Sequence, residues 1–590
     1  MADEALQGWR RHVFGPGAGR TAVLLATVLS LPFCFVGLFA DDYFHQLAIE
    51  RAALMPVTPW DLFTFAWGDP ARLRPIIERG PYSWWTLPEL KFSFLRPLTC
   101  ALANFDALAF GRAFFFHHLH SVAWHVALVA VVAALFRRAL GPVAPLAGLA
   151  ALLFTLDDAH TVVAGWIANR NALVSTVAAL LGVLAHVRWR EQGWRPGLPL
   201  SLLGCAVGLS AGETALGAIA YLVAYELTAA PGPWRTRLRS LVPIALLGAG
   251  YIALYRASGS GAYGSEIYVD PMREPLRFLV QAPAKALALI GAQFLGATAD
   301  LWMVRVAARP LLAATGVLAL VLMVVLARRV WPRLPEPERR GVRWLTLGAA
   351  FSLVPVLATF PLNRLLLMPS IGGSALVAVV LLYGWRAAGD RLLRAGARLL
   401  FVMNVVVGLL GWPAAAVILK LGADEQTRSS LETKLSDEAL AGRVVIFVAP
   451  DPAASLYVPM VRAWHHKPLP RSWNTLSFAP FAHRLTRTGP DTVELEVVDG
   501  RMLETVFEQL MRGASFPLPL GMKVKLEGSE VTVVGLNEGL PNRISLRFDE
   551  NPDLGGYTIA QWENGELAPL RLPAVGQTLE LPRLHSLLAP

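Results

Sequence analysis

Long uncharged runs of apolar residues recur along the first 420 residues. The first run, 21–40, contains no Asp, Glu, Lys or Arg and is followed at once by two carboxylates, Asp41 and Asp42. A helix of about 20 apolar residues is long enough to cross roughly 30 Å of hydrocarbon. The pattern therefore predicts a mostly α, polytopic membrane protein of about 11 transmembrane helices within residues 21–420. The runs centre near residues 30, 125, 150, 180, 205, 222, 248, 318, 352, 379 and 409.

Arginine residues gather in alternate joints between these runs. By the positive-inside rule, such joints lie in the cytoplasm. This places residues 1–20 inside and the carboxyl terminus outside, in the orientation of a bacterial inner-membrane protein. A signal peptide is the alternative for 21–40, but the apolar run is too long and position 38 is not small, which favours an uncleaved anchor. The arginine-rich joints contain Arg10, Arg11, Arg20, Arg137, Arg138, Arg188, Arg190, Arg195, Arg235, Arg237 and Arg239, and the segments 327–344 and 385–398.

One apolar segment does not fit the alternation. If residues 275–296 formed a full span, the arginine-rich joint that follows would be outside. We interpret this segment as a re-entrant or interfacial helix packed on the outer face. The predicted external parts are then a long loop at about 41–114, short loops near 160, 213 and 364, the stretch 257–307 and the carboxyl-terminal tail.

From about residue 436 the apolar runs give way to short, alternating segments. "RVVIFVAP" predicts a buried strand, and "TVELEVVDG" predicts a half-exposed strand that ends in a turn at Asp499 and Gly500. "MKVKLEG", "VTVVGL" and "ISLRFD" predict further strands, and 501–512 a helix. Residues 436–590 are thus expected to form a small, soluble α+β or β-rich domain outside the membrane, after a linker at 421–435.

Composition supports a membrane location. The 590 residues are 55% hydrophobic and only 16% charged, whereas a soluble chain carries about a quarter charged residues. The net charge of +10 arises in the arginine-rich joints, so it does not indicate nucleic acid binding. The three cysteines, Cys34, Cys100 and Cys205, are far apart and show no metal-type spacing.

Polar residues recur near the predicted outer face. Ionisable groups at helix mouths around one face indicate a functional site, although an acid at a membrane surface is also an ordinary loop residue. Two aspartates and a histidine in "DDAH" are possible ligands for a divalent metal; these are Asp157, Asp158 and His160. The whole set is Asp41, Asp42, Asp157, Asp158, His160, Asn169, Arg170, Glu213, Asn363 and Arg364.

Several motifs resemble a known family. "FLRPLTCALANFDALAFG", "HHLHSVAWHVALVAVVAALFRR", "LFTLDDAHTVVAGWIANRNALVS", "LSAGETALGAIAYLVAYEL" and "FPLNRLLLMPSIGGSALVA" follow one another across about residues 35–385. Together they resemble the transmembrane and tetratricopeptide-repeat O-mannosyltransferases and their bacterial relatives. That family belongs to the glycosyltransferase C superfamily, whose members take sugars from polyprenyl-phosphate donors.

The resemblance implies roles for the polar residues. Asp41 or Asp42 is expected to be the catalytic base, with Asp41 favoured by resemblance alone. A carboxylate suits this role because a glycosyl phosphate already has a good leaving group and the acceptor hydroxyl must lose its proton. A guanidinium suits the departing phosphate, which it binds in bidentate fashion. The expected donor and substrate-binding residues are Arg364, Arg170, His160 and Glu213.

The chain also departs from the family. Gly212 stands where the family has a lysine before the glutamate, Ala159 precedes His160 where the family has a His-Pro pair, and Ala172 replaces an aspartate. The repeat array is absent, and the domain from 436 is unrelated to it. A transporter or flippase for a lipid-linked saccharide, and a non-catalytic cell-envelope relative, therefore remain alternatives. The expected partners are the lipid bilayer, a polyprenyl-phosphate sugar and an acceptor that is a protein, a lipid or a glycan.

Overall fold

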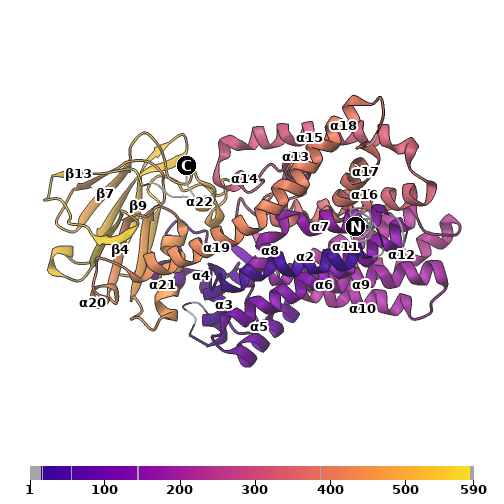
Figure 1. Ribbon diagram of the computed structural model, residues 1–590. Helices are drawn as coiled ribbons and strands as arrows, with labels where there is room; N and C mark the ends of the chain where they lie inside the picture. Colours follow the sequence, from indigo (N-terminus) through magenta and orange to yellow (C-terminus); the bar gives the residue numbers. More distant parts are fainter. Residues whose placement is uncertain are drawn as a thin grey trace.

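The computed structural model describes residues 15, 17–52, 54, 56–141, 145–385 and 387–584. Most of the predicted cytoplasmic segment 1–20 and the last six residues lie outside this part of the chain. Figure 1 shows a bundle of helices joined at one end to a β-rich domain formed by the carboxyl-terminal third. The prediction of a mostly α membrane protein with a small β-rich domain is confirmed.

Seven helical segments in the described chain are long and apolar enough to cross a membrane, or eight if a bent pair is counted as one span. The chain is therefore a multi-pass membrane protein. The seven are Ala18–Phe35 (α2 and η1), Phe114–Leu140 (α6), Ile167–Gln192 (η3 and α9), Trp234–Ala257 (α12), Pro275–Leu295 (α13), Val306–Arg333 (η5, α15 and η6) and Arg391–Leu431 (α18, η8 and α19); the bent pair is Pro145–Leu156 (α7) with Asp158–Gly165 (η2 and α8).

Each of the eleven predicted centres lies in a helix, and seven of them lie in segments long and apolar enough to cross, with the bent pair counted as one span. The helices at the other four centres do not meet these two conditions. Three of those helices are shorter than the roughly 20 residues that a crossing needs, and a fourth begins with the charged sequence "EPERRGVR". Helices enclosed by others need not expose a complete apolar surface to lipid. The four are α10 (Gly197–Ala211), α11 (Leu216–Thr228), α17 (Pro369–Gly384) and α16 (Glu336–Val356).

α13 runs parallel to α15 (Arg309–Val330). Lys285 and Arg309 lie 5.8 and 5.5 Å from the centre of the same ring, Phe360, and Gly291 further along α13 packs against Gly316 of α15. Two neighbouring helices that run in the same direction require the chain between them to return. This course agrees with the interpretation of 275–296 as a re-entrant segment, although α13 has the length and apolarity of a span.

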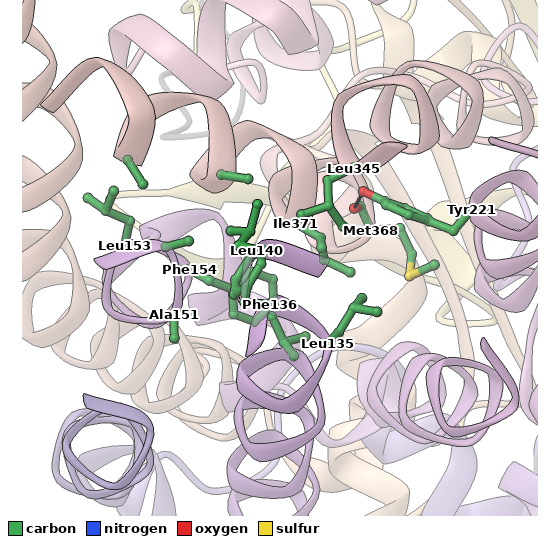
Figure 2. Packing of buried hydrophobic residues seen from close by; sticks show 14 of the residues in the cluster. Leu135, Phe136, Leu140, Ala151, Leu153, Phe154, Tyr221, Leu345, Met368 and Ile371 are labelled. Carbon is green, nitrogen blue, oxygen red and sulfur yellow. Dashed lines mark hydrogen bonds between the residues drawn. The ribbon is translucent and has the colours of Figure 1, made fainter. Parts of the chain in front are cut away.

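The helices meet in one large apolar core. Figure 2 shows Tyr221 of α11 reaching the start of α17, where its hydroxyl donates to the Met368 carbonyl at 3.0 Å and accepts from the Gly372 N–H at 3.1 Å. α9 (Arg170–Gln192) and α10 approach closely because Gly204 and Gly208 leave no room for a Cβ against the α9 backbone. Other residues in the view are Leu135, Phe136 and Leu140 of α6, Ala151, Leu153 and Phe154 of α7, Leu345 of α16 and Ile371 of α17.

The arginine-rich joints lie together at the end of the bundle away from the β-rich domain. Arg138 after α6 pairs with Glu191 of α9 at 2.5 Å, and Arg329 of α15 pairs with Asp390 before α18 at 3.0 Å. The predicted topology requires these joints to lie on one side of the membrane, because arginine-rich joints are cytoplasmic by the positive-inside rule.

The predicted strands of the carboxyl-terminal domain are present, in two sheets. The six-stranded antiparallel sheet has the order β13-β6-β7-β10-β9-β8, and the four-stranded mixed sheet has the order β12-β11-β4-β5. The predicted helix at 501–512 is shorter, α22 (Val506–Met511). The strands are β4 (Arg443–Val448), β5 (Ser472–Ser477), β6 (His483–Arg487), β7 (Thr492–Val497), β8 (Lys523–Leu526), β9 (Ser529–Asn537), β10 (Leu540–Phe548), β11 (Thr558–Glu563), β12 (Glu566–Pro569) and β13 (Thr578–Leu581).

The long external loop and the carboxyl-terminal domain share a hydrophobic core. Trp84 and Trp85 of the loop are buried in the same cluster as Trp473 and Phe478 of the domain. The loop contains α3 (Asp41–Ile49), α4 (Pro70–Arg79) and α5 (Pro97–Phe110), and β1 (Thr64–Trp67) and β2 (Lys91–Ser93), which form a three-stranded sheet with β3 (Gly261–Tyr263).

The expected linker at 421–435 is mostly helix. α19 (Gly408–Leu431) continues from the membrane bundle up to the domain, which begins with α20 (Asp437–Leu440). A continuous helix is stiffer than a flexible linker, so the domain is held against the end of the bundle where α19 finishes.

Candidate functional site

Asp41 and Asp42 begin α3 at the boundary between the membrane bundle and the outer domain. The chain turns sharply just before them: Ala40 has φ 51° and ψ −118°, a conformation that residues other than glycine rarely adopt. Gln426 of α19 holds this turn by accepting the Ala40 N–H at 2.9 Å. A strained turn that is held by a distant helix often marks a functional site.

The structure separates the two aspartates. Asp42 is 1% exposed, and its two carboxylate oxygens accept the backbone N–H groups of Ala168 at 2.7 Å and Phe39 at 3.0 Å. Burial raises the pKa of Asp42 to about 8, against the lowering effect of these two bonds. Asp42 therefore ties α3 to the start of α9, and its burial closes it off from a ligand.

Asp41 is partly exposed and faces the carboxyl-terminal domain. The hydroxyl of Tyr457, on α21 (Pro452–Trp464), donates to Asp41 Oδ1 at 2.6 Å. Desolvation raises the pKa of Asp41, while the Tyr457 hydrogen bond and the charge of Arg364 lower it. Of the two carboxylates, Asp41 is the one placed to act on a bound molecule.

Arg364 lies in η7 (Asn363–Leu367), the short helix before α17. Its guanidinium is 5.2 Å from the centre of the Trp166 ring, and the Trp166 indole N–H donates to the Phe39 carbonyl at 3.1 Å, two residues before Asp41. Arg364 is partly exposed, and among the described residues its guanidinium has no hydrogen bond or ion pair within 4 Å. A cation close to Asp41 thus retains its hydrogen-bond donors.

A second charged pair lies nearby. Arg96 donates to Glu213 Oε2 from Nε at 3.0 Å and contacts it from Nη2 at 2.9 Å. Tyr268 lies between this pair and the first, since the charges of Arg364, Arg96, Asp41 and Glu213 all act on its pKa, which burial raises. Arg96 belongs to the "FLRPL" motif and supplies Glu213 with the cation that Gly212, next to it in the chain, lacks.

Arg170 does not face this group. Its guanidinium is 2% exposed, forms an ion pair with Asp106, and donates to Ser121 Oγ at 2.8 Å and the His117 carbonyl at 2.5 Å. Every donor edge of the fork is engaged inside the bundle. The expectation that Arg170 binds a donor phosphate is therefore corrected to a structural role.

His160 and the "DDAH" motif are also placed differently from the expectation. His160 is fully buried, with Nε2 at 2.8 Å from Ser370 Oγ, and Asp157 accepts from the Ala159 N–H and from Gln293 Nε2, both at 3.1 Å. Within the described chain, no group of three or more Asp, Glu, His or Cys side chains could hold a metal ion. In the structure His160 is therefore enclosed, and Asp157, Asp158 and His160 are not gathered around a common point.

Two hollows among the described residues lie away from Asp41. One of about 380 Å³ is between residues 303–307 and the carboxyl-terminal domain, and one of about 740 Å³ is between residues 54–81 and 459–473. Neither is lined by Asp41 or Arg364. The candidate site is therefore defined by its polar groups at the bundle–domain boundary.

Two residues of this group were missed by the sequence analysis. Arg96 could have been recognised from the sequence, because it precedes a proline at the start of an apolar helix, in the motif that begins "FLRPL". Tyr457 had none, since it is 416 residues from Asp41 and lies in a domain without a recognised motif.

The chain was compared with protein families, curated proteins and solved structures. No family model and no curated protein matches the chain. Among solved structures, it is similar to the crystal structure of ArnT from Cupriavidus metallidurans bound to undecaprenyl phosphate, with a TM-score of 0.34 and 13% identity over 76% of this chain and 85% of that chain. At this TM-score the likeness establishes neither fold nor function, so the function is inferred from the site itself.

Proposed function

We propose that this protein is a membrane glycosyltransferase of the glycosyltransferase C type, which transfers a sugar from a polyprenyl-phosphate donor to an acceptor outside the cytoplasm. The observation that supports this most is the meeting of a partly exposed carboxylate, Asp41, with a cation that keeps its donors free, Arg364, at the outer mouth of the bundle. The proposal also rests on the family resemblance of residues 35–385.

Each group has a task in the transfer. The acceptor hydroxyl oxygen forms a bond to the anomeric carbon of the sugar, and the bond from that carbon to the phosphate oxygen breaks. The electron pair of the broken bond stays on the polyprenyl phosphate, and the hydroxyl proton passes to Asp41. Arg364 neutralises the charge that grows on the phosphate. No acid is required, because a phosphate leaves without protonation.

The electrostatics of Asp41 suit a base. Desolvation raises its pKa above the ordinary value for an aspartate, and a base whose pKa is closer to the working pH takes a proton more readily. Arg364 and the Tyr457 hydrogen bond limit this rise, because both favour the ionised form that accepts the proton.

The position of Arg364 suits a lipid-linked donor. The phosphate of a polyprenyl phosphate must lie near the membrane surface, because the chain is apolar and the headgroup is charged. Arg364 precedes α17 at the bundle–domain boundary, with its guanidinium 5.2 Å from the centre of the Trp166 ring. Guanidinium makes bidentate contacts with phosphate, and the donors of Arg364 are not engaged by other described residues.

The proposal also includes the orientation of the protein in the membrane. With the arginine-rich joints in the cytoplasm, Asp41 and the β-rich domain lie outside. A reporter that is active only in the cytoplasm, fused to the carboxyl terminus, should be inactive. Activity of that fusion would reverse the orientation.

The decisive experiment measures transfer directly. The purified protein is incubated with radiolabelled polyprenyl-phosphate hexoses and a membrane extract as the source of acceptor, and label is followed into material separable from the donor. We expect transfer by the wild type and none by an Asp41→Asn, Arg364→Ala double variant. Wild-type protein that never consumes any donor, or equal transfer by the double variant, would rule out the proposal.

A further inference from the structure

The carboxyl-terminal domain reaches the membrane part of the site through Tyr457. The helix that carries it, α21, is held from both sides: Val458 and Val461 are buried in the outer core, and Ser455 Oγ accepts from Thr475 Oγ1 of β5 at 3.0 Å. Arg462, 1% exposed, donates to the Ser430 carbonyl at the end of α19 at 3.4 Å. The backbone of α21 is therefore fixed relative to the bundle.

The hydrogen bond that Tyr457 makes is selective for one oxygen of Asp41. It ends on Oδ1 at 2.6 Å, and Oδ2 has no hydrogen bond to any described residue. A carboxylate without such a contact is free to rotate about its last bond, whereas one held by a rigid phenol presents its second oxygen in one direction. A base must lie within about 2.6–3.2 Å of the proton it removes, so this orientation bears directly on the rate.

We propose that Tyr457 is a positioning residue for Asp41: it holds Oδ1, leaves Oδ2 for the acceptor hydroxyl, and thereby makes the carboxyl-terminal domain part of the catalytic site. This inference rests on the proposed function. It gives the domain, for which the family resemblance supplies no role, a task in the chemistry.

Tyr457 stays protonated while it holds Asp41 Oδ1. Desolvation and the charge of Asp41 raise the pKa of Tyr457 well above its ordinary value, so the hydroxyl remains a donor at any working pH. A hydrogen bond given to a carboxylate stabilises the ionised form. Tyr457 therefore both orients Asp41 and keeps it ionised.

The other groups around Asp41 are accounted for. Arg364 of η7 favours the ionised form of Asp41, and the charge of Asp41 in turn raises the pKa of the neighbouring Asp42. Tyr82 lies near the pair, but its hydroxyl donates to the Phe65 carbonyl at 2.5 Å; Tyr268 lies near Arg364 and Arg96. Tyr457 alone donates a side-chain hydrogen bond to Asp41 among the described residues.

The test variant is Tyr457→Phe, which keeps the ring and removes the donor. Tyr43→Phe is the matched control: its hydroxyl lies 2.9 Å from Thr427 Oγ1 and does not touch Asp41. Without the donor the ionised form of Asp41 is less stable, so its pKa rises and the acid limb of the rate profile moves to higher pH. On the acidic side of the profile, turnover should be about tenfold below wild type, the loss expected for a hydrogen bond to a charged group, with KM for the donor unchanged.

A second measurement does not depend on activity. A carbodiimide modifies a carboxyl only in its protonated form. Fragmentation of the peptide in the mass spectrometer separates Asp41 from Asp42 and reports the modified fraction of Asp41 at each pH. In Tyr457→Phe this fraction should stay high up to a higher pH than in the wild type and in Tyr43→Phe. Unmoved profiles in both measurements, with folded protein, would overturn the inference. Wild-type protein that never consumes donor would refute the proposed function, and the labelling would still decide the role of Tyr457.

Discussion

The clearest consequence of the structure is that two identical substitutions at neighbouring positions should have opposite effects. Asp41→Asn and Asp42→Asn each replace one carboxylate oxygen by an amide nitrogen of nearly the same size. At position 41 the carboxylate is partly exposed and accepts from Tyr457, whereas at position 42 it is buried between two backbone N–H groups. From the sequence, only the family resemblance favours Asp41 over Asp42.

The magnitudes follow from these contacts. An asparagine at 41 can still accept from the Tyr457 hydroxyl through its carbonyl oxygen, so the free energy of unfolding should change little. The proton acceptor is lost, which should lower turnover on the order of 10²-fold or more. An asparagine at 42 must turn its NH₂ toward the N–H of either Phe39 or Ala168. One buried donor is then unpaired, at a cost of about 1–3 kcal/mol.

The assay compares thermal unfolding in detergent with transfer from a radiolabelled polyprenyl-phosphate hexose, normalised to folded protein. We expect Asp41→Asn to be inactive with a wild-type melting temperature. Asp42→Asn should melt lower, while each folded molecule keeps most of its turnover. The reverse pattern, with Asp42→Asn inactive when folded and Asp41→Asn active, would refute the assignment of the base.

Four further outcomes are expected. Arg364→Lys should be partly active, and Arg364→Ala should bind donor more weakly as well as turn over more slowly, because lysine keeps the charge but loses the fork. Arg170→Ala should leave the buried Asp106 without its guanidinium partner, with only His120, among the described residues, at hydrogen-bond distance from the carboxylate, and destabilise the protein by about 3–5 kcal/mol, seen as a lower melting temperature. Ala40→Gly should relieve a positive φ and stabilise the fold by about 1 kcal/mol. Since Asp41 acts ionised and its pKa is raised, activity should fall with decreasing pH at a higher pH than an ordinary aspartate would give.

Each of these has a result that would count against it. Unchanged donor affinity in Arg364→Ala would place the phosphate elsewhere. If Arg170→Ala melted at the wild-type temperature and bound the donor more weakly, Arg170 would be a donor-binding residue and not a structural one. Destabilisation by Ala40→Gly would mean that the methyl group packs better than the strained turn suggests. An acid limb at the ordinary aspartate value would show that Asp41 is better solvated than its surroundings indicate.

The charged pairs show why candidate residues could be found in the sequence but not assigned. Arg170, Arg364 and Glu213 each lie at a helix mouth, and the pattern of spans predicts that level for all of them. Arg170 turns inward to Asp106 and Arg364 turns outward beside Asp41. The direction depends on which helices pack against each other, because this packing decides which carboxylate lies within reach of each guanidinium.

The departures from the family pattern are explained only by the structure. Gly212 removes a cation next to Glu213 in the chain, and this supports a non-catalytic relative when the sequence is considered alone. Arg96, 117 positions away, contacts the same carboxylate at 2.9 Å. A salt bridge needs the two charges close in space, whatever their distance in sequence.

The sequence by itself determined the membrane helices, the strands of the outer domain and the place of the acid pair. These features follow from local rules: an apolar run of sufficient length partitions into lipid, alternation predicts a half-buried strand, and a carboxylate directly after a span must lie at its mouth. Only the tertiary structure decided that Asp42 is a structural tie, that Asp41 faces outward, and that Tyr457 completes its surroundings. Those outcomes depend on hydrogen bonds between segments up to 416 residues apart, whose geometry is set by the packing of α3, α19 and α21 and is not encoded in any one stretch of the chain.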